Sequence, residues 1–412
     1  MGSSVPAHLP ILDLALADDP AQRPALLGQL REALFDVGFL YIKSHGVASS
    51  TISHLTSRLP ALFDLPTDIK ADLSKLNSPH FLGYSGFAEE TTLGQKDLRE
   101  QFDFATELPV VYKPAEGRRN SAASSNSNAG SSRDFSQLYW RLRGPNQWPP
   151  EALLPGFRQA LETYHDALQA LSYRFVHLVE EAFGIPVHFG RPAPRFGQAD
   201  HHQADVPAPQ HRIKLLKYPP NSTNCGQGVG PHKDSSGWLT FLLQIGREAG
   251  LEVLAADGET WISAPPIDDT FVVNFGNAFE AATEGAVKAT VHRVTAPPPS
   301  SPARYSIPFF QGLPLDMTVS EIRSYMPLSV RTLRRQQDSH SNHDCQDNQK
   351  DAAKSSGKTD ATTRPKPADT VSSFLDARWD ALGESQLRKW IRSHEDVGRR
   401  WYGDDVVRYY AG

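Results

Sequence analysis

The sequence contains very little cysteine. Only Cys225 and Cys345 occur among its 412 residues, and two thiols cannot form the dense disulfide framework of a small secreted domain. Such a low count fits a reducing compartment. Residues 1–6 contain no apolar run of the kind that a signal peptide requires. We therefore expect a cytoplasmic protein.

The sequence also lacks a long apolar run and an excess of positive charge. No apolar stretch is long enough to span a bilayer, so we expect no membrane partner. The 42 lysines and arginines are outnumbered by 47 aspartates and glutamates, and no basic patch dominates. Nucleic acid is therefore not an expected partner. With 39% hydrophobic residues, the chain can form one large domain with embellishments or two small ones.

The first half of the chain mixes predicted strands with predicted helices. Apolar residues recur every three or four positions in residues 24–37, 52–63 and 156–183, which is the period of an amphipathic helix. Residues 9–14 and 38–43 are short apolar runs that indicate strands. This half therefore predicts an α/β region followed by one long helix.

From residue 213 onward the pattern becomes that of strands. Residues 239–245 form a nearly continuous apolar run, which suits a strand buried on both faces. Further short runs, separated by Gly, Pro and Asp, lie at residues 251–255, 260–262, 270–275, 287–294 and 305–310. Many short strands at this spacing indicate a sandwich or a jelly roll. We predict an α+β protein with a mainly β core and flanking helices.

Two polar stretches interrupt this organisation. Residues 120–132 are rich in Ser and Asn, and residues 336–370 contain scarcely a large apolar side chain. Neither can bury enough apolar surface to offset the entropy of ordering, so we predict flexible or disordered insertions. The predicted segments are an N-terminal region (8–110), a Ser-rich insertion (111–135), a long helix and loop (136–212), a β core (213–315), a disordered insertion (336–370) and a C-terminal helix (371–404).

A histidine and an aspartate stand two residues apart at the start of the β core. In an extended chain such residues point to the same face, so His232 and Asp234 can aim at one point. A second histidine, His292, lies in the strand-like run 287–294. Two histidines and one carboxylate form the facial triad that holds non-haem Fe(II) and leaves positions open for substrates and O2. We predict a metal site here, although a His-x-Asp pair alone often marks only a turn with a capping aspartate.

An arginine and a serine share one face of the last predicted strand. Arg304 beside Ser306 is a good receptor for a carboxylate, because the guanidinium offers a planar fork of donors. Tyr218, at the end of the run 213–218, could add a phenol donor or could be a packed core residue. Open metal positions with a carboxylate receptor set back from them suit a 2-oxo dicarboxylic acid.

With these residues in place, the chain resembles a known family, the isopenicillin N synthase-like group of Fe(II)/2-oxoglutarate-dependent dioxygenases. In the β core the resemblance rests on Tyr218-Pro219-Pro220, His232-Lys233-Asp234, Leu239 to Gln244, Gly250-Leu251-Glu252-Val253, Trp261-Ile262, Val273 to Asn277, His292-Arg293-Val294 and Arg304-Tyr305-Ser306. In the front half it rests on Pro10 to Leu14, Gly38-Phe39, His45-Gly46-Val47, Phe63 to Pro66 and Gly83-Tyr84. Each piece is weak alone, and their joint order over most of residues 8–315 makes the resemblance specific.

The resemblance implies a double-stranded β-helix (jelly roll) with an N-terminal α/β region. It implies Fe(II) held by the two histidines and the aspartate, and 2-oxoglutarate held by Arg304 and Ser306 with Tyr218 assisting. The implied reaction uses O2 to hydroxylate, desaturate or cyclise a small organic substrate and gives succinate and CO2. By family analogy the substrate is a small metabolite of a biosynthetic pathway.

Two other functions fit the same residues. An iron oxidase of this fold would spend no 2-oxoglutarate, and succinate production separates it from the dioxygenase. A non-catalytic binding protein could keep the fold, but such a protein would usually lose at least one of the metal or carboxylate-binding side chains.

Several further residues have two interpretations at this stage. Arg99, Glu100 and Phe102 could line the substrate pocket or be ordinary strand residues, and Asn274 could support the iron site or end a strand. Trp390 is interpreted as a core residue. We expect the loop histidines His201, His202 and His211 to be solvated. His340, His343 and Cys345 have the wrong spacing for a structural zinc finger.

Overall fold

The computed structural model describes residues 8–114, 133–185, 209–220, 226–234, 238–332 and 377–411. The insertions predicted at residues 120–132 and 336–370 lie outside the described residues, as do His201, His202, His340, His343 and both cysteines. In the described part of the chain, no helix is both long and apolar enough to cross a membrane.

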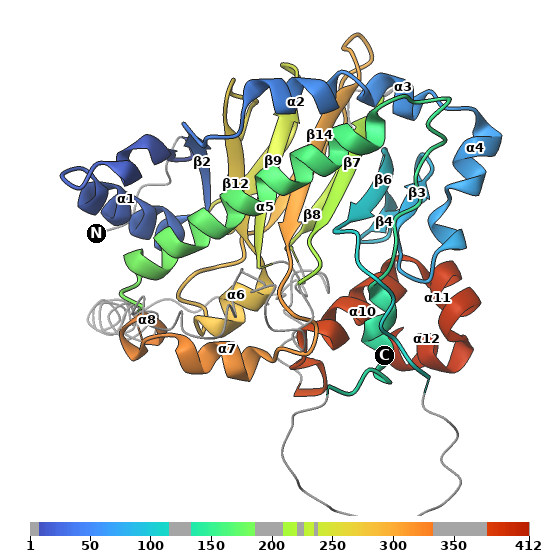
Figure 1. Ribbon diagram of the computed structural model, residues 1–412. Helices are drawn as coiled ribbons and strands as arrows, with labels where there is room; N and C mark the ends of the chain where they lie inside the picture. Colours follow the sequence, from blue (N-terminus) through green and yellow to red (C-terminus); the bar gives the residue numbers. More distant parts are fainter. Residues whose placement is uncertain are drawn as a thin grey trace, which may run out of the picture.

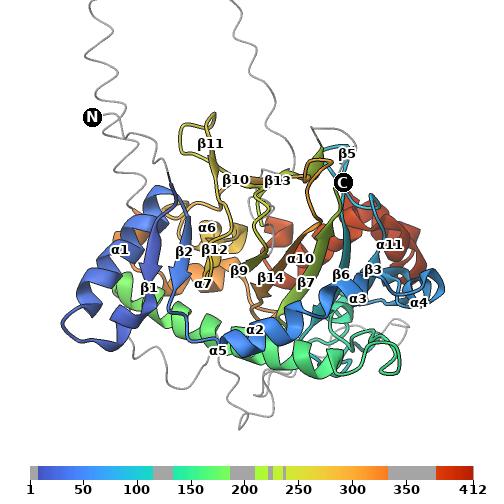
Figure 2. The ribbon, with the colours of Figure 1, turned by 90° about the horizontal axis from the view of Figure 1, so that it is seen from above.

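A large sheet of eight strands forms the middle layer of the molecule, in the order β1-β2-β12-β9-β14-β7-β6-β3 (Figure 2). Neighbouring strands are antiparallel except for the parallel pair β1 and β2. The strands are β1 (Ile11–Asp13), β2 (Phe39–Lys43), β3 (Gly83–Ser85), β6 (Glu100–Ala105), β7 (Arg212–Tyr218), β9 (Leu239–Ile245), β12 (Phe271–Phe275) and β14 (Arg304–Gln311). The N-terminal strands therefore extend the same sheet that the β core builds.

A second, antiparallel sheet of four strands packs on the first. Its order is β11-β10-β13-β8, from β8 (Gln227–His232), β10 (Leu251–Leu254), β11 (Trp261–Ser263) and β13 (His292–Thr295). Leu216 and Val272 of the large sheet lie in one buried cluster with Val229, Val253 and Val294 of the small sheet. Two antiparallel sheets packed face to face confirm the predicted jelly roll within an α+β fold.

Helices cover the face of the large sheet that is turned away from the small one. α5 (Phe157–Ala182) runs across β12, β9, β14 and β7, and α1 (Arg23–Asp36) and α2 (Ser49–Thr56) lie on the same side (Figures 1 and 2). The apolar stripe predicted for α5 is buried, and its members are Phe157, Leu161, Tyr164, Leu168, Leu171, Phe175, Leu178 and Val179. This stripe explains why a polar-faced helix of 26 residues lies flat on the sheet.

Two predicted elements differ in extent from the observed ones. The helix predicted over residues 52–63 is two helices, α2 and α3 (Leu59–Phe63), and Pro60 occupies the first turn of α3. Of the strand predicted over 287–294, only the last residues join β13. The remaining elements are η1 (Leu14–Asp18), α4 (Thr67–Asp72), η2 (Lys75–Asn77), β4 (Thr91–Thr92), β5 (Gln95–Lys96), η3 (Leu138–Leu142), α6 (Asn277–Ala282), α7 (Val319–Tyr325), α8 (Leu328–Arg331) and η7 (Ala377–Trp379).

The C-terminal helix predicted over residues 371–404 is two helices in the structure, and a third helix follows it. They are α10 (Leu382–Ser393), α11 (Glu395–Tyr402) and α12 (Asp404–Ala411). The first break falls at His394, whose backbone is extended, and the second at Gly403, whose φ of 90° ends a helix readily. Trp390 is buried in the cluster that joins these helices to Phe81 and Trp140, as its core interpretation expects. The packing brings α10 close to the strands β6 and β7 (Figure 1).

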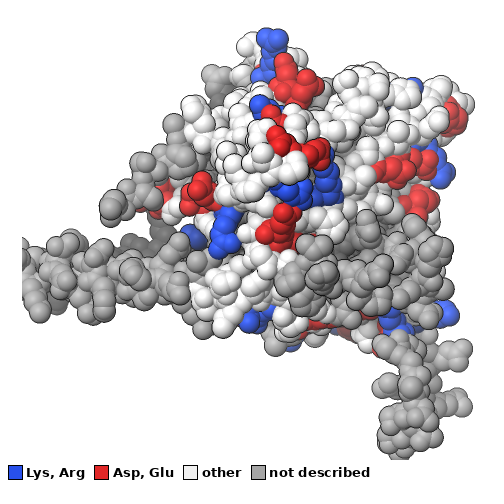
Figure 3. Space-filling model, turned by 60° about the vertical axis from the view of Figure 1, so that its left-hand side comes forward, with Lys and Arg blue, Asp and Glu red and all other residues white. Residues whose placement is uncertain are grey.

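The surface carries charges of both signs. On the face shown in Figure 3, lysine and arginine are interspersed with aspartate and glutamate rather than gathered by sign. This distribution agrees with the near balance of 42 basic and 47 acidic residues in the sequence.

Candidate metal centre and its cavity

Two neighbouring strands of the small sheet present the two predicted histidines side by side. His232 at the end of β8 is the cross-strand partner of His292 at the start of β13, and the two ring centroids lie 4.3 Å apart. Asp234 follows β8 after one residue, and its Oδ1 is 3.9 Å from His292 Nε2. One ligand atom of each of the three side chains lies within 4.8 Å of the other two, so the structure brings the predicted triad together.

Both imidazoles are held in the same orientation by backbone carbonyls. His232 Nδ1 lies 2.8 Å from the Gly230 oxygen, and His292 Nδ1 lies 3.0 Å from the Thr290 oxygen. A carbonyl can only accept a hydrogen bond, so each Nδ1 carries a proton and each Nε2 is the ring nitrogen that is available to a metal. Burial, followed by the nearby His292, lowers the pKa of His232 to about 3, so this ring stays neutral at physiological pH. Neutral imidazoles of this kind are metal ligands.

The aspartate is oriented by two donors on one of its oxygens. Thr240 Oγ1 and Asn274 Nδ2 each donate to Asp234 Oδ2 at 2.7 Å, which leaves Oδ1 facing the histidines. Burial alone would raise the pKa of this carboxyl, but the two imidazoles and these two hydrogen bonds outweigh it and lower the pKa. Of the two roles open for Asn274, the structure therefore supports the one behind the metal site.

A buried arginine lies further along the same cavity. Arg304, only 1% exposed, donates from Nη2 to Gln244 Oε1 at 2.8 Å. Its Nε and Nη1 have no hydrogen-bond partner among the described residues. Burial lowers the pKa of Arg304, and the neighbouring Tyr218 acts in the opposite direction. Such a cation with free donors is stable only when an anion or water completes its hydrogen bonds.

The other two predicted cosubstrate residues lie beside this arginine. Tyr218 is directly across from Arg304 in the pairing of β7 with β14, and the guanidinium carbon lies 5.0 Å from the centroid of its ring. Ser306, two residues along β14, lines the same cavity. The three side chains therefore form one group, as the sequence predicts.

The cavity that contains both groups has a volume of about 520 Å³. Its walls come from both sheets, from the β4–β5 hairpin and from α10. This volume is in the range of pockets that hold one or two small molecules.

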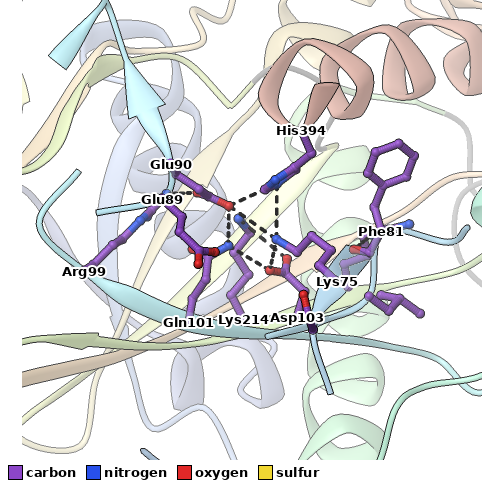
Figure 4. A network of polar contacts seen from close by, with 12 residues as sticks. Lys75, Phe81, Glu89, Glu90, Arg99, Gln101, Asp103, Lys214 and His394 are labelled. Atoms are coloured by element: carbon purple, nitrogen blue, oxygen red, sulfur yellow. Dashed lines mark hydrogen bonds and ion pairs between the residues drawn. The ribbon is translucent and has the colours of Figure 1, made fainter. Parts of the chain in front are cut away.

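A network of ion pairs forms the wall at the β6 side of the cavity (Figure 4). Glu90 Oε2 accepts from Arg99 at 2.6 Å, and Asp103 Oδ2 lies 2.8 Å from Lys75 Nζ. Glu90 Oε1 is also 3.1 Å from His394 Nε2, at the end of α10. Burial and the nearby Lys75 lower the pKa of His394, and the contact with Glu90 acts in the opposite direction.

The structure separates the residues that had two interpretations. Arg99 lines the cavity, whereas Phe102 is a core residue with no exposed surface. Glu100 lies in β6 and accepts from Lys70 Nζ at 3.2 Å, outside the cavity. Sequence reasoning missed the cavity residues Lys214 and Lys389. Only the position of Lys214 in a predicted strand, alternating with the core residues of that strand, could have suggested that it faces the cavity.

The prediction that His211 is solvated is wrong. This residue has no exposed surface, and it lies against Tyr173 of α5, with Nε2 2.7 Å from the phenol oxygen. Its Nδ1 accepts from the Gly312 N–H at 3.0 Å, and burial lowers its pKa to about 3. His211 precedes β7 directly and follows the alternation of that strand into the interior, which explains the error.

A jelly roll that carries two histidines and a carboxylate beside open space defines a class of protein, the mononuclear non-haem iron oxygenases. Comparison with known sequences gives the same class. Residues 9–151 match the family described as "non-haem dioxygenase in morphine synthesis N-terminal", and residues 209–312 match the "2OG-Fe(II) oxygenase superfamily".

Relatives at higher identity span nearly the whole chain. The 2-oxoglutarate-dependent dioxygenase frbJ of Dothideomycetidae sp. (strain 11243) is 36% identical over 98% of this chain and 94% of its own length. A 2-oxoglutarate-dependent dioxygenase of Gibberella zeae is 30% identical over 96% of this chain and 91% of its own length. This chain therefore belongs to the 2-oxoglutarate/Fe(II)-dependent dioxygenases, which confirms the resemblance. It is an oxidoreductase that uses Fe(II), 2-oxoglutarate and O2.

Solved structures agree on the fold. A putative 2OG-Fe(II) oxygenase family protein of Caulobacter crescentus has a TM-score of 0.57 at 24% identity and covers 78% of this chain and 92% of its own. The rice dioxygenase for auxin oxidation has a TM-score of 0.51 at 24% identity and covers 76% of this chain and 85% of its own.

Proposed function

We propose that this dioxygenase oxidises a C–H bond of a small organic molecule at an Fe(II) held by His232, Asp234 and His292. Support comes from the donor set, which consists of two imidazole nitrogens and one carboxylate oxygen, all within 4.8 Å of one another. This set suits Fe(II) and leaves coordination positions open. Thr240 and Asn274 fix the carboxylate, so the chain keeps the three ligands oriented.

We further propose that Arg304, Ser306 and Tyr218 bind the distal carboxylate of 2-oxoglutarate. The observation that carries this assignment is the pair of buried Arg304 nitrogens without partners. A carboxylate placed there accepts charge-assisted hydrogen bonds from the guanidinium, the serine hydroxyl and the phenol. An oxidase of this fold would place a substrate carboxylate on the same cation, so succinate release separates it from the dioxygenase.

In this arrangement each part of the chain has a separate task. Bound Fe(II) supplies the oxidative chemistry, in which O2 and 2-oxoglutarate give succinate and CO2 while the substrate loses a hydrogen atom. Arg304 and its neighbours orient the cosubstrate. The cavity walls hold the substrate and keep water out, and how they hold it decides between hydroxylation, desaturation and ring closure.

The relatives support a small metabolite as the substrate. They include enzymes named clavatol oxidase, from Penicillium crustosum, and homoarginine-6-hydroxylase, from Glycine max, which are 28% and 29% identical to this chain. A cavity of about 520 Å³ accommodates 2-oxoglutarate together with a molecule of similar size. We infer a role in the biosynthesis of a small secondary metabolite.

The test is made without O2. Fe(II) and then 2-oxoglutarate are added to the apoprotein, and the visible charge-transfer band of the chelate is recorded for wild type, His232→Ala and Arg304→Met. We expect the band for wild type, no band for His232→Ala, and for Arg304→Met a band only at much higher 2-oxoglutarate. A wild-type protein that binds iron but forms no band would contradict the cosubstrate assignment, and one that binds no iron would contradict the metal site.

A further inference from the structure

One strand, β14, runs along the cavity from one end to the other. Arg304, Ser306, Pro308 and Phe310 alternate along β14 and all line the cavity. At about 3.3 Å per residue, this face is roughly 20 Å long. The cosubstrate occupies the Arg304 end, so the Phe310 end remains for the organic substrate.

The metal site lies toward the Phe310 end. Phe310 pairs with Thr240 of β9, and Thr240 donates to the metal-binding carboxylate of Asp234 at 2.7 Å. A molecule that extends from Arg304 to the metal therefore fills the first part of the cavity. A second molecule must reach the metal through the part walled by Phe310 and α10.

The charges in this part of the cavity are nearly balanced by ion pairs (Figure 4). Lys214 Nζ lies 3.6 Å from Asp103 Oδ1, and Arg99 pairs with Glu90 at 2.6 Å. Among the described residues of this network, three cations face three carboxylates, namely Lys75, Arg99 and Lys214 against Glu90, Asp97 and Asp103. The network itself therefore has no cation left for a ligand.

Lys389 of α10 is an additional cation beside this balanced network. It lines the cavity, and its Nζ lies 5.0 Å from the centroid of the Trp390 ring and 6.0 Å from that of Phe310. Within the described part of the chain, it has no hydrogen bond and no ion pair. Burial, followed by the nearby Lys214, lowers the pKa of Lys389 to about 8, so most molecules still carry the charge at pH 7.

Lys389 and Arg304 thus lie at opposite ends of the cavity, where Arg304 is fully buried and Lys389 is partly exposed. Each is a cation at the cavity wall whose donors the described chain does not fully use, and Arg304 is the one that the cosubstrate carboxylate satisfies. From this parallel, we propose that Lys389 binds a carboxylate of the organic substrate, which is therefore an organic acid presented as its anion. The inference rests on the proposed function, because it assumes that 2-oxoglutarate occupies the Arg304 end.

A carboxylate is the anion that matches the ammonium group of Lys389 in charge. One ammonium group balances one carboxylate, whereas a phosphate monoester carries about −1.5 to −2 charges and would need a second cation, such as the exposed Arg392 further along α10. Phe310 and Trp390 beside the ammonium supply aromatic surface for the carbon skeleton next to the carboxylate. Lys389 also lies outside residues 9–151 and 209–312, which carry the family match, so substrate selection is assigned to a segment beyond the shared core.

The experiment compares acids with their primary amides. A library of aliphatic and aromatic monocarboxylates, each paired with its own amide, is screened for stimulation of succinate release by the Fe(II)- and 2-oxoglutarate-loaded enzyme. We expect the best compounds to be acids whose amides stimulate weakly. In Lys389→Met, the half-maximal concentration of the best acid should rise about 30-fold or more, while that of its amide changes less than about threefold.

Two further variants complete the test. Lys389→Arg restores a positive charge and should recover most of the preference for acid over amide. Arg408→Gln removes a charge from a 73%-exposed side chain of α12 and should leave the preference unchanged. The proposal is overturned if no acid outperforms its amide, or if Lys389→Met keeps the wild-type preference. In both cases the charge-transfer band and the substrate-free succinate release stay intact, whereas their loss in wild type would instead contradict the proposed function.

Discussion

The two ends of the cavity are built in different ways. The iron and cosubstrate end comes from short motifs in adjacent strands, where His232 pairs with His292 and Arg304 pairs with Tyr218. The far end is assembled from the β4–β6 region, β7 and the C-terminal helix α10, which lie far apart in the sequence. The residues for iron and cosubstrate binding can therefore be recognised from short local motifs, whereas the part of the cavity that remains for the organic substrate depends on long-range packing.

The largest effect should follow loss of a metal ligand at the iron end. Asp234→Ala removes the carboxylate and also leaves the Thr240 and Asn274 donors without their acceptor. We expect substrate-dependent succinate release to fall by about 10³-fold or more, because the metal carries the oxidation. Iron content after anaerobic loading measures the cause directly. Retained iron with full turnover would show that the ligand assignment is wrong, and an unchanged circular dichroism spectrum controls for folding.

A smaller effect should follow a change at the cosubstrate residue. Arg304→Lys keeps the charge and loses the planar fork, so the concentration of 2-oxoglutarate needed for half-maximal rate should rise by about 100-fold. The rate at saturating 2-oxoglutarate should change much less. Arg293→Lys is the matched control, since Arg293 lies outside the cavity in a half-buried pair with Glu252. An equal effect of both variants would remove the special role of Arg304.

The residues behind the metal should matter less than the ligands. Asn274→Ala and Thr240→Val each remove one hydrogen bond to Asp234 Oδ2, so we expect the affinity for Fe(II) to weaken by about 10- to 100-fold for each variant. Anaerobic Fe(II) titration measures this, and the double variant shows whether the two donors act together. A change in turnover without a change in Fe(II) affinity would indicate that these donors do not act through the metal site.

Sequence reasoning recovered the iron end for a physical reason. Spacing of two residues in a strand fixes the direction of side chains, so Arg304 and Ser306 could be placed without knowing the fold. Asp234 lies just beyond the end of β8, and its carboxylate is oriented by Thr240 and Asn274 instead. The spacing of short apolar runs left a sandwich and a jelly roll open, the family resemblance implied the jelly roll, and the structure confirms it. The break after Ser393 was missed because the apolar period continues across it, and α12 lies beyond the predicted helix, which ended at residue 404.

The far end could not be predicted in the same way. Lys389 lies on a helix whose pattern shows only that Leu387, Trp390 and Ile391 face a core. Whether the adjacent Lys389 lines the cavity depends on how α10 packs near β7. No local spacing in the sequence specifies that packing. Lys214 and Asp103 become partners only because β6 pairs with β7 in one register.

The smallest effect concerns a histidine that the sequence pattern placed on the surface. His211 is neutral for the same reason as His232, namely burial, and its pKa is about 3 instead of the usual 6.5. Between these two pH values the unfolded chain binds a proton at His211 and the folded chain does not. The contribution of His211 to stability is therefore complete above pH 6.5 and is lost as the pH falls toward 3. At a pH of about 5.5 the loss in the free energy of unfolding is about 1.4 kcal/mol.

Urea unfolding at about pH 7.5 and about pH 5.5 measures this loss. His211→Gln, which cannot titrate, should reduce the difference between the free energies of unfolding at the two pH values by about that amount. If wild type and His211→Gln lose equal stability on acidification, the histidine is not held neutral by burial, and its correction from a solvated to a buried residue would fail.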